Sequence, residues 1–329
     1  MDILIGAIDI GATKVAVTVA DASGPLAKVT QPTAKSGTVD TLSKQVLALM
    51  GEACAKAEVD PTSLTAVGVS SCGPFVRSEG KICLSSPNIC GGLANRGDFP
   101  NNWLVVPLQQ PLEQRYGRVV IHNDCVAALH GERMFGAVID EPNCVYVTWS
   151  TGVGFGLCVD GNLLMGKQGN AGHAGHMLME PEGTTRCGCG NLGDLESLIS
   201  GMNISRGLPL DTPALFAAAR NGDPAALASV NAAATWLGRA LYNLVVTLDT
   251  KVFMIGGSVW QHHGDWLAPV VQKEIDARFP TLTKGVVVME PGLGALVADI
   301  GALSLVMPSD WLQDWRNRQP WRKSVHLPN

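Results

Sequence analysis

Residues 9–14 read Asp-Ile-Gly-Ala-Thr-Lys and directly follow the apolar run Ile-Leu-Ile-Gly-Ala-Ile at 3–8. An acid at the end of a predicted strand, a glycine-containing turn, a hydroxyl and an ammonium group therefore lie close together. Backbone N–H groups in such a turn can face an anion, and a carboxylate suits a magnesium ion. The spacing differs from the G-x-x-x-x-G-K-[ST] phosphate loop. Together with the second apolar run at 15–19, the stretch predicts a hairpin that binds a polyphosphate with its magnesium; an ordinary hairpin turn is the alternative.

The composition indicates a globular protein without a membrane or nucleic-acid signature. The chain has 329 residues, enough for two domains, with 46% apolar and 16% charged residues. A net charge of −5 lacks the positive character of a nucleic-acid binder, and no apolar run of about 18 residues predicts a membrane span. The N-terminus has no basic leader, and most of the nine cysteines are scattered, as buried thiols are. We therefore expect a cytoplasmic protein.

Strand-like and helix-like segments alternate along the chain. They are defined by continuous β-rich runs and by apolar residues at helical spacing. After the first hairpin, strands are expected at 64–70, 119–121, 144–148, 155–159, 252–255 and 285–289, and helices at 41–57, 126–135, 224–249 and 295–306. The alternation is typical of an α/β protein, and the hairpins with glycine turns at 3–19 and 144–160 suggest duplicated halves.

Two further polar segments follow predicted strands. Residues 150–156, Ser-Thr-Gly-Val-Gly-Phe-Gly, place glycines at alternate positions, which lets the backbone approach a phosphate; a flexible turn is the simpler interpretation. Asn123 and Asp124 lie between an apolar strand and a helix, where an aspartate is most often a helix cap. A kinase that acts on an alcohol needs a carboxylate to accept the hydroxyl proton. Asp124 is the best-placed candidate for that role.

Four residues between positions 176 and 194 form a candidate metal site. His176, Cys187, Cys189 and Asp194 offer one nitrogen, two sulfur and one oxygen ligand, a set that tetrahedral zinc accepts. Free thiols and an unrelated histidine are the alternative interpretation. Because four protein ligands leave no open coordination position, the predicted zinc is structural.

Taken together, these segments resemble the ROK family of sugar kinases. The motifs that carry the resemblance are Asp9-Ile-Gly-Ala-Thr-Lys14, Asn123-Asp124, Ser150-Thr-Gly-Val-Gly154, Gly175-His176, Cys187-x-Cys-Gly-x-x-Gly193-x-Leu-Glu196 and Ile255-Gly-Gly257. The resemblance implies an α/β, two-lobed actin-like ATPase (ribonuclease H-like) fold with a ligand cleft between the lobes. The small lobe would be residues 1–122, joined by a C-terminal helix at about 308–329. The large lobe would be residues 123–307, with the zinc-binding loop.

The resemblance also implies an activity and its residues. The expected reaction is ATP-dependent phosphorylation of a sugar hydroxyl, O6 of a hexose in most of the family, with Mg²⁺ and a structural Zn²⁺, in a homodimer. Asp124 would be the general base. By resemblance, the residues that would bind the substrate are Asn88, Asn123, His173, His176 and Glu196. Those that would surround the phosphates, the magnesium ion and the adenosine are Asp9, Gly11, Thr13, Lys14, Thr151, Gly152, Gly256 and Gly257.

Two positions depart from the family pattern. His173 stands where the family usually has a glutamate that takes two sugar hydroxyls. A neutral imidazole offers one donor and one acceptor and cannot grip a vicinal diol as a carboxylate does. Glucose and mannose are therefore less favoured, and another hexose, a ketose or a cyclitol becomes an alternative acceptor. Asp194 stands where the third zinc-binding cysteine normally lies; oxygen ligation is harder but allowed, and we still expect a metal.

Three other interpretations are weighed against the kinase. A sugar-responsive regulator, which the same family contains, would carry an added N-terminal DNA-binding module, and a phosphate hairpin beginning at residue 9 leaves no room for one. The segment 286–294 resembles a dinucleotide-binding turn but lacks the third glycine. A chain that keeps the kinase fold and has lost the activity is the third. The sequence does not name the acceptor, the preferred phosphoryl donor or the oligomeric state.

Overall fold

The computed structural model describes residues 3–93, 99–180 and 182–322, which form two compact units. Of the described residues, unit 1 comprises 3–93, 99–140, 165–171 and 292–322, and unit 2 comprises 141–164, 172–180 and 182–291. Each unit is built around one five-stranded sheet. The lobe division predicted between residues 122 and 123 stays a prediction; the contact-based units place residues 123–140 with the first sheet.

The sheet of unit 1 has the strand order β3-β2-β1-β4-β8. Its strands are β1 (Leu4–Ile10), β2 (Lys14–Asp21), β3 (Gly24–Pro32), β4 (Leu64–Ser71) and β8 (Val119–Asn123). The first three strands pair antiparallel, whereas β1, β4 and β8 run parallel to one another. The carboxyl ends of the parallel strands therefore meet at one edge of the sheet, where Asp9, Ser70 and Asn123 lie.

The sheet of unit 2 repeats this arrangement with the order β11-β10-β9-β12-β13. Its strands are β9 (Cys144–Trp149), β10 (Val153–Val159), β11 (Asn162–Leu163), β12 (Val252–Gly256) and β13 (Val287–Met289). Again the first three pair antiparallel and β9, β12 and β13 run parallel. The predicted α/β class and the predicted duplication of the two halves are therefore confirmed at the level of strand topology.

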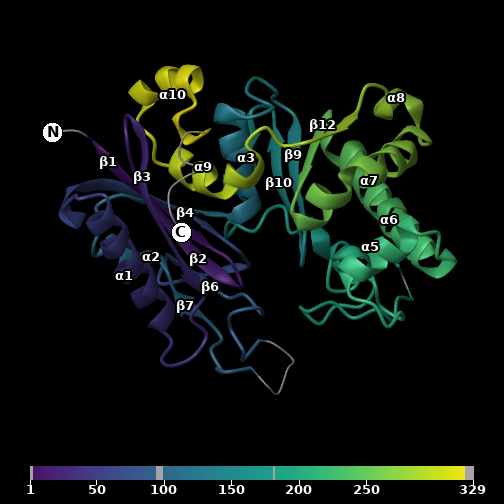
Figure 1. Ribbon diagram of the computed structural model, residues 1–329, viewed down its shortest axis with the longest axis horizontal. Coiled ribbons are helices and arrows are strands. Elements are labelled where there is room, and N and C mark those ends of the chain that lie inside the picture. Colours follow the sequence, from purple (N-terminus) through teal and green to yellow (C-terminus); the bar gives the residue numbers. More distant parts are fainter. Residues whose placement is uncertain (1–2, 94–98, 181, 323–329) are drawn as a thin grey trace. The chain divides into compact units, whose positions relative to one another are not determined.

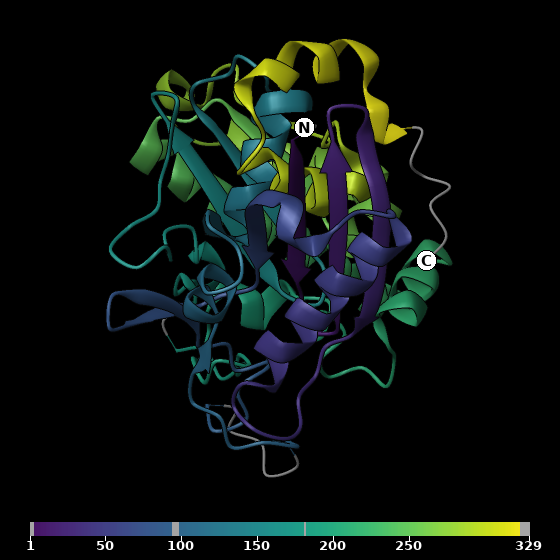
Figure 2. The same ribbon diagram turned by 90° about the vertical axis from the view of Figure 1, so that its left-hand side faces the viewer.

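Helices cover both faces of the sheet of unit 1 (Figures 1 and 2). These helices are α1 (Thr41–Lys56) on one face and α3 (Asp124–Phe135) and α9 (Val297–Ser304) on the other. Alternate residues of β1 divide between the two faces, because successive side chains of a strand point in opposite directions. Ile8 and Ile10 pack in the cluster of α1, and Ile5 and Ala7 pack in the cluster of α9. The α1 helix lies in front of the strands in Figure 2.

Glycines let α9 approach both the sheet and α3 closely. A Cβ at Gly68 would lie 2.0 Å from the carbonyl oxygen of Ala302, and a Cβ at Gly131 would lie 3.0 Å from Cα of Gly301. The first distance leaves no room for a side chain, and at Gly131 the neighbouring backbone would have to shift to admit one, so packing favours glycine at both positions. The contact fixes α3, whose first residue is Asp124.

The carboxylate of Glu132, in the last turn of α3, binds backbone N–H groups after the helix and at residues 292–293, where the chain returns to unit 1. Glu132 is fully buried and accepts hydrogen bonds from the backbone N–H groups of Ala137 (2.8 Å), Gly292 (2.9 Å) and Leu293 (2.8 Å). The turn at 292–294 was the part of the sequence that resembles a dinucleotide-binding turn. Its first two N–H groups face a glutamate instead of an anion site, so the structure gives that interpretation no support.

His130 on α3 predicts a loss of stability at acidic pH. Its Nδ1 lies 2.7 Å from Oγ of Ser304, and burial lowers the pKa of His130 to about 4, with the positive charges of His122 and Arg133 adding to the effect. The unfolded imidazole titrates near pH 6.5, so stability is fully present above about pH 6.5 and is lost as the pH falls towards about 4. When the pH is lowered from about 7.5 to about 5, the free energy of unfolding should fall by about 2 kcal/mol more in the wild type than in His130→Gln.

Thermal unfolding at the two pH values measures this difference. His262→Gln, which changes an exposed histidine in unit 2, is the matched control and should follow the wild type. An equal loss of stability in the wild type and in His130→Gln would contradict the prediction.

A small sheet of unit 1 with the order β5-β6-β7 was not predicted. Its strands are β5 (Phe75–Ser78), β6 (Lys81–Leu84) and β7 (Val106–Pro107), and the short helix α2 (Gln109–Glu113) and the 3-10 turn η1 (Pro61–Ser63) belong to the same unit. Strands this short give little periodicity, which is why the sequence did not reveal them. The turn with Asn88 follows β6 directly.

The helices of unit 2 are α4 (Leu195–Ile199), α5 (Thr212–Arg220), α6 (Pro224–Leu248), α7 (Ser258–Asp276) and α8 (Pro280–Thr283), with the 3-10 turn η2 (Ala174–His176). The α6 helix was predicted, and Asp223 caps it by accepting a hydrogen bond from the N–H of Ala226 at 2.8 Å. The α7 helix was not predicted, although Leu267, Val271 and Ile275 recur at helical spacing and are buried. Within the described residues, no helix is long and apolar enough to cross a membrane.

The described C-terminal residues pack on unit 1 as three short elements. These are η4 (Ser309–Trp311), α10 (Leu312–Arg318) and η5 (Pro320–Arg322), preceded earlier in the chain by η3 (Gly294–Leu296) and α9. The single helix expected at about 308–329 is therefore wrong for residues 309–322, and residues 323–329 lie outside the described residues. Three tryptophans anchor this segment, because Trp311, Trp315 and Trp321 are all buried.

Candidate active site

Asp9 and Asp124 lie at the carboxyl edge of the sheet of unit 1. Asp9 is the second-last residue of β1 and accepts a hydrogen bond from Oγ of the fully buried Ser70 at 3.0 Å. Asp124 begins α3, directly after β8. The helix cap is Asn123, whose Oδ1 accepts the N–H of Cys125 at 3.0 Å, and not the aspartate itself. Asp124 is therefore not the capping residue of α3.

Both carboxyl groups are harder to ionise than ordinary aspartates. Burial raises the pKa of Asp9 to about 6, and the negative charges of Asp124 and Asp299 contribute, while Ser70 and Lys14 act in the opposite direction. Burial likewise raises the pKa of Asp124, against hydrogen bonds from Cys125 and Asn123. Two half-buried carboxylates that repel each other form a pair that a cation or a proton would stabilise. Such groups are typical of functional sites.

The first predicted phosphate turn is a tight hairpin end. The N–H of Gly11 donates to the carbonyl oxygen of Lys14 at 2.9 Å, and Oγ1 of Thr33 donates to the carbonyl of Gly11 at 2.7 Å. Thr13 and Lys14 are exposed at its tip. The hydroxyl and the ammonium group are thus free of the core and close to the end of β1 that carries Asp9.

The loop after β4 lies beside the carboxyl end of β1. The N–H of Cys72 donates to the carbonyl of Ile10 at 2.9 Å, and Sγ of Cys72 lies 4.0 Å from Oγ of Ser86. Burial raises the pKa of Cys72 to about 12, so its thiol stays protonated. Asn88, two residues after Ser86, is an exposed residue of the next turn. Unit 1 therefore brings Asp9, the 72–75 loop and the turn with Asn88 to neighbouring positions.

Unit 2 places its two glycine segments at the carboxyl edge of its own sheet. Residues 150–152 form the turn between β9 and β10, in which the N–H of Ser150 donates to the carbonyl of Gly152 at 2.9 Å. Gly256 ends β12, which runs parallel to β9, and Gly257 precedes α7. Gly257 has φ +89°, and a Cβ there would lie 2.5 Å from the carbonyl oxygen of Trp149. Thr151 is exposed at the tip of the turn.

Glu196 ties the α4 helix to the glycine turn at 150–154. Its Oε2 accepts the N–H of Val153 at 2.9 Å, and a Cβ at Gly152 would lie 2.7 Å from the same oxygen. Its Oε1 lies 3.2 Å from Sγ of Cys187. His173 directly precedes η2 and its ring lies 6.2 Å from that of His176, centroid to centroid. Unit 2 thus gathers three of the predicted sugar-binding side chains.

The four predicted metal ligands converge in unit 2. One ligand atom from each of His176, Cys187, Cys189 and Asp194 lies within 4.8 Å of all the others. Nδ1 of His176 is 3.0 Å from Oδ2 of Asp194, 3.7 Å from Sγ of Cys187 and 3.5 Å from Sγ of Cys189. In a tetrahedral zinc site with ordinary bond lengths, neighbouring nitrogen and sulfur ligands stand about 3.5 Å apart. The donor set and its spacing therefore fit a zinc ion.

Asp194 has a second function in the same place. Its Oδ1 accepts the N–H of Ser197 at 2.8 Å and so caps α4, while Oδ2 faces His176 and Cys189. The helix cap fixes the orientation of the carboxylate. The cap therefore directs the other carboxylate oxygen towards His176 and Cys189.

The sequence did not reveal two polar residues that support the candidate site. Ser70 donates to Asp9, and its position at the end of the strand predicted at 64–70 was the available signal. Asn170 binds the backbone of Phe75, 95 residues earlier in the chain, and no local pattern indicates such a pair.

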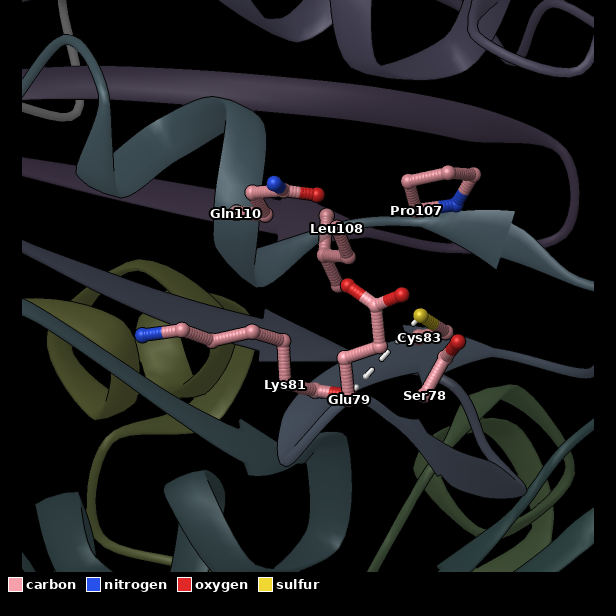
Figure 3. Close-up of a pocket in the computed structure, with 7 residues that line it drawn as sticks. All are labelled: Ser78, Glu79, Lys81, Cys83, Pro107, Leu108 and Gln110. Carbon is pink, nitrogen blue, oxygen red and sulfur yellow. Dashed lines mark hydrogen bonds between the residues drawn. The ribbon is translucent and has the colours of Figure 1, made fainter.

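The described residues also form a pocket in unit 1 that is separate from these residues (Figure 3). Its volume is about 180 Å³, and it is lined by Ser78, Glu79, Lys81, Cys83, Pro107, Leu108 and Gln110. Figure 3 shows the carboxylate of Glu79 directed towards Leu108, whereas the ammonium group of Lys81 points away. None of the predicted site residues lines this pocket.

Named sugar kinases are among the known proteins that this chain resembles. The model of the ROK family matches residues 5–308. Glucokinase of Pyrobaculum calidifontis is 34% identical over 220 residues, which are 65% of this chain and 68% of that protein. N-acetylmannosamine kinase of Salmonella newport is 34% identical over 261 residues, 77% of this chain and 82% of that protein. The structure of a ROK glucokinase from Streptomyces griseus, in complex with glucose and AMPPNP, is 27% identical with a TM-score of 0.67, covering 92% of this chain and 99% of that one.

The fold, with its duplicated sheets, is that of the actin-like ATPases. The similar proteins named above are sugar kinases, and this chain is a sugar kinase as well. The chain belongs to the ROK family. The resemblance based on the motifs between residues 9 and 257 is thereby confirmed, as are the fold class and the enzyme class.

Proposed function

We propose that the chain phosphorylates the O6 hydroxyl of a hexose derivative with ATP, and that Asp124 is the general base. The observation that carries this proposal is the placement of Asp124, at the start of α3 and outside the helix cap, beside the carboxyl ends of three parallel strands. Its raised pKa gives it a higher proton affinity than an ordinary aspartate, which suits a group that accepts a proton from an alcohol. Phosphoryl transfer needs little more than such a base, positioning and charge neutralisation.

Asp9 and the exposed hairpin tip supply the groups expected around the phosphates. The Lys14 ammonium group and the Thr13 hydroxyl are donors for phosphate oxygens, and Asp9 offers oxygen ligands of the type that Mg²⁺ takes. The fit is supported by the repulsion between Asp9 and Asp124, which a cation would relieve. Bound Mg²⁺ neutralises phosphate charge. Gly11, Thr151, Gly152, Gly256 and Gly257 complete the proposed nucleotide set.

The imidazole of His173 favours a 2-acetamido hexose as the acceptor. A carboxylate at this position accepts from two hydroxyls, as the family pattern implies. A neutral imidazole accepts one hydrogen bond and donates one, which matches a hydroxyl next to an acetamido carbonyl oxygen. One of the matched relatives is named N-acetylmannosamine kinase. We therefore propose N-acetylmannosamine as the acceptor, bound by Asn88, Asn123, His173, His176 and Glu196.

Glucose is the second candidate acceptor, because another relative of equal identity is named glucokinase. We expect wild-type kcat/KM to be higher for N-acetylmannosamine than for glucose, and His173→Glu to shift the ratio of the two kcat/KM values towards glucose by about tenfold or more. The physical reason is that the glutamate recovers two acceptors for a vicinal diol and loses the donor to the acetamido group. Coupled ADP-release assays with both sugars measure the ratio.

His262→Glu is the matched control, since it introduces the same charge at an exposed position of α7 and should leave the ratio unchanged. A ratio that stays at the wild-type value in His173→Glu would show that residue 173 does not face the acceptor.

We further propose that His176, Cys187, Cys189 and Asp194 hold a structural zinc ion. A bound zinc would cross-link η2, the 187–189 turn and the start of α4, and so fix the residues that lie beside His173 and Glu196. Because all four positions are protein ligands, the ion has no open site and takes no part in the transfer.

Elemental analysis should find about one zinc per chain, and Cys187→Ser should lose it. Loss of the cross-link is expected to lower the thermal midpoint of Cys187→Ser markedly, because binding energy of a structural zinc is folding energy. Cys144→Ser, which changes a buried cysteine on β9, is the control and should retain the metal. Wild-type protein that is stable and free of zinc would contradict the site. The expected homodimer stays a prediction that a mass measurement in solution can test.

A further inference from the structure

Residues 165–171 belong to unit 1, although the residues on both sides of them belong to unit 2. We call this segment the 165–171 loop. The N–H of Ala171 donates to the carbonyl of Met165 at 3.1 Å and closes it. Gly166 and Gly169 have φ values of +68° and +88°, which glycine adopts without strain and which give the loop its turns.

Asn170 holds the loop on unit 1 with both ends of its side-chain amide. Its Oδ1 accepts the N–H of Phe75 at 2.7 Å, and its Nδ2 donates to the carbonyl of Phe75, also at 2.7 Å. This is the pairing that a neighbouring strand would offer to Phe75. A Cβ at Gly169 would lie 3.5 Å from Cδ2 of the Phe75 ring, so the loop also packs against that buried ring.

Phe75 lies in the part of unit 1 that carries Asn88. It pairs with Leu84 between β5 and β6, and the carbonyl of the preceding residue, Pro74, accepts the N–H of Ser85 at 2.9 Å. The turn with Asn88 begins after Ser86. The Phe75 backbone to which Asn170 is hydrogen-bonded thus pairs with β6, the strand that precedes the turn with Asn88, a residue proposed to bind the acceptor sugar.

The end of the loop is fixed on unit 2. The N–H of Phe155 donates to the carbonyl of Gly172 at 3.1 Å, and Gly172 has φ +91° with its Cα facing the β10 backbone, where a Cβ would lie 2.2 Å from the carbonyl oxygen of Phe155. His173 is the next residue. Two anchors thus lie within three residues of His173, one at Asn170 and one at Gly172.

We propose that Asn170 is a positioning residue for the acceptor sugar: by holding the 165–171 loop on Phe75, it sets where the chain enters the segment that presents His173. The inference rests on the proposed acceptor-binding roles of His173 and Asn88. Without the two hydrogen bonds, the loop keeps its Gly172 anchor and its packing against the Phe75 ring, and loses its hold on the Phe75 backbone. In such a variant only a fraction of the molecules has the loop ordered before the sugar binds. The apparent affinity for the sugar is then the intrinsic affinity multiplied by that fraction.

Steady-state kinetics of Asn170→Ala and Asn170→Asp test the proposal. In Asn170→Ala we expect KM for the acceptor to rise about tenfold or more, with KM for ATP and kcat within about twofold of the wild type. Asn170→Asp keeps the Oδ1 acceptor but places a carboxylate oxygen against the Phe75 carbonyl oxygen, so its KM for the acceptor should rise at least as much as in Asn170→Ala. Asn162→Ala is the matched control, because Asn162 is exposed on β11 and its side-chain amide donates to the carbonyl of Asp160. An unchanged KM for the acceptor, or equal rises in both KM values, would overturn the proposal.

Amide hydrogen exchange supplies a readout that does not depend on activity. In Asn170→Ala the exchange of the Phe75 N–H should accelerate about tenfold or more, whereas the Phe155 N–H should keep its protection. Unchanged exchange at Phe75 would remove the physical basis of the proposal. Faster exchange at Phe75 with an unchanged acceptor KM would overturn the positioning role and leave the kinase assignment intact. A wild type that phosphorylates no hexose would overturn the proposed function itself, while the exchange result would still report on the anchor.

Discussion

Asp124→Asn is expected to lower kcat for sugar phosphorylation by about 10²–10⁴-fold, the usual contribution of a general base, with ATP binding nearly unchanged. The asparagine keeps the size of the side chain and the hydrogen bond to the N–H of Cys125, which the wild-type carboxylate accepts at 2.9 Å. It removes only the ability to take the proton of the acceptor hydroxyl. Single-turnover kinetics and nucleotide titration measure the two quantities separately.

The same substitution should make the protein more stable near neutral pH. Burial raises the pKa of Asp124, which means that the folded chain disfavours the ionised form. The contribution of Asp124 to the free energy of unfolding therefore falls as the pH rises from the pKa of the unfolded chain through the raised pKa of the folded one. The neutral amide of the variant does not ionise and avoids this loss. The stabilisation by Asp124→Asn should shrink on acidification, once the wild-type carboxyl is protonated.

Asp160→Asn is the matched control, because Asp160 is an exposed turn residue and an asparagine tolerates its φ of +51°. It should change neither turnover nor stability appreciably. Transfer at a rate close to the wild type in Asp124→Asn would remove Asp124 from the mechanism, whatever its effect on stability.

Trp315→Ala is expected to destabilise unit 1 by about 3–5 kcal/mol, as large aromatic deletions from a packed core do. Trp315 is fully buried, its ring centroid lies 6.0 Å from those of Trp311 and Phe135, and its Nε1 donates to the carbonyl of Ala22 at 3.1 Å. The substitution therefore leaves a cavity where α10, the end of α3 and the β2–β3 turn meet. Thermal or urea unfolding measures the loss.

Trp315→Phe separates packing from hydrogen bonding in this cluster. It keeps most of the ring contact and loses the bond to Ala22, so we expect a loss of about 1–2 kcal/mol. Leu104→Ala, at a side chain that is 58% exposed in unit 1, is the control and should stay within about 0.5 kcal/mol of the wild type. A Trp315→Ala variant as stable as this control would show that the C-terminal segment does not anchor unit 1.

Elements with strong local patterns were predicted closely. The helix expected at 41–57 is α1 (Thr41–Lys56), and the strand expected at 64–70 is β4 (Leu64–Ser71), because continuous apolar periodicity defines both. The α7 helix was missed even though its apolar spacing is regular. Polar and helix-breaking residues such as His262, Gly264 and Pro269 interrupt the pattern in the sequence.

The candidate site divides in the same way. The convergence of the four proposed metal ligands could be predicted, because they lie within a short stretch of chain and their residue types are distinctive. The hydrogen bond from Ser70 to Asp9 and the grip of Asn170 on Phe75 could not, because each joins residues far apart in sequence. Such contacts depend on how parallel strands and returning loops are placed by the fold.

The most direct test of the kinase assignment is ADP release by the wild-type protein with ATP and Mg²⁺ against a panel of hexoses, 2-acetamido hexoses, ketoses and cyclitols, followed by identification of the phosphorylated position by NMR. We predict rapid turnover with N-acetylmannosamine, slower turnover with glucose and a product phosphorylated at O6. Background hydrolysis alone across the whole panel, with ATP binding demonstrated, would contradict the assignment.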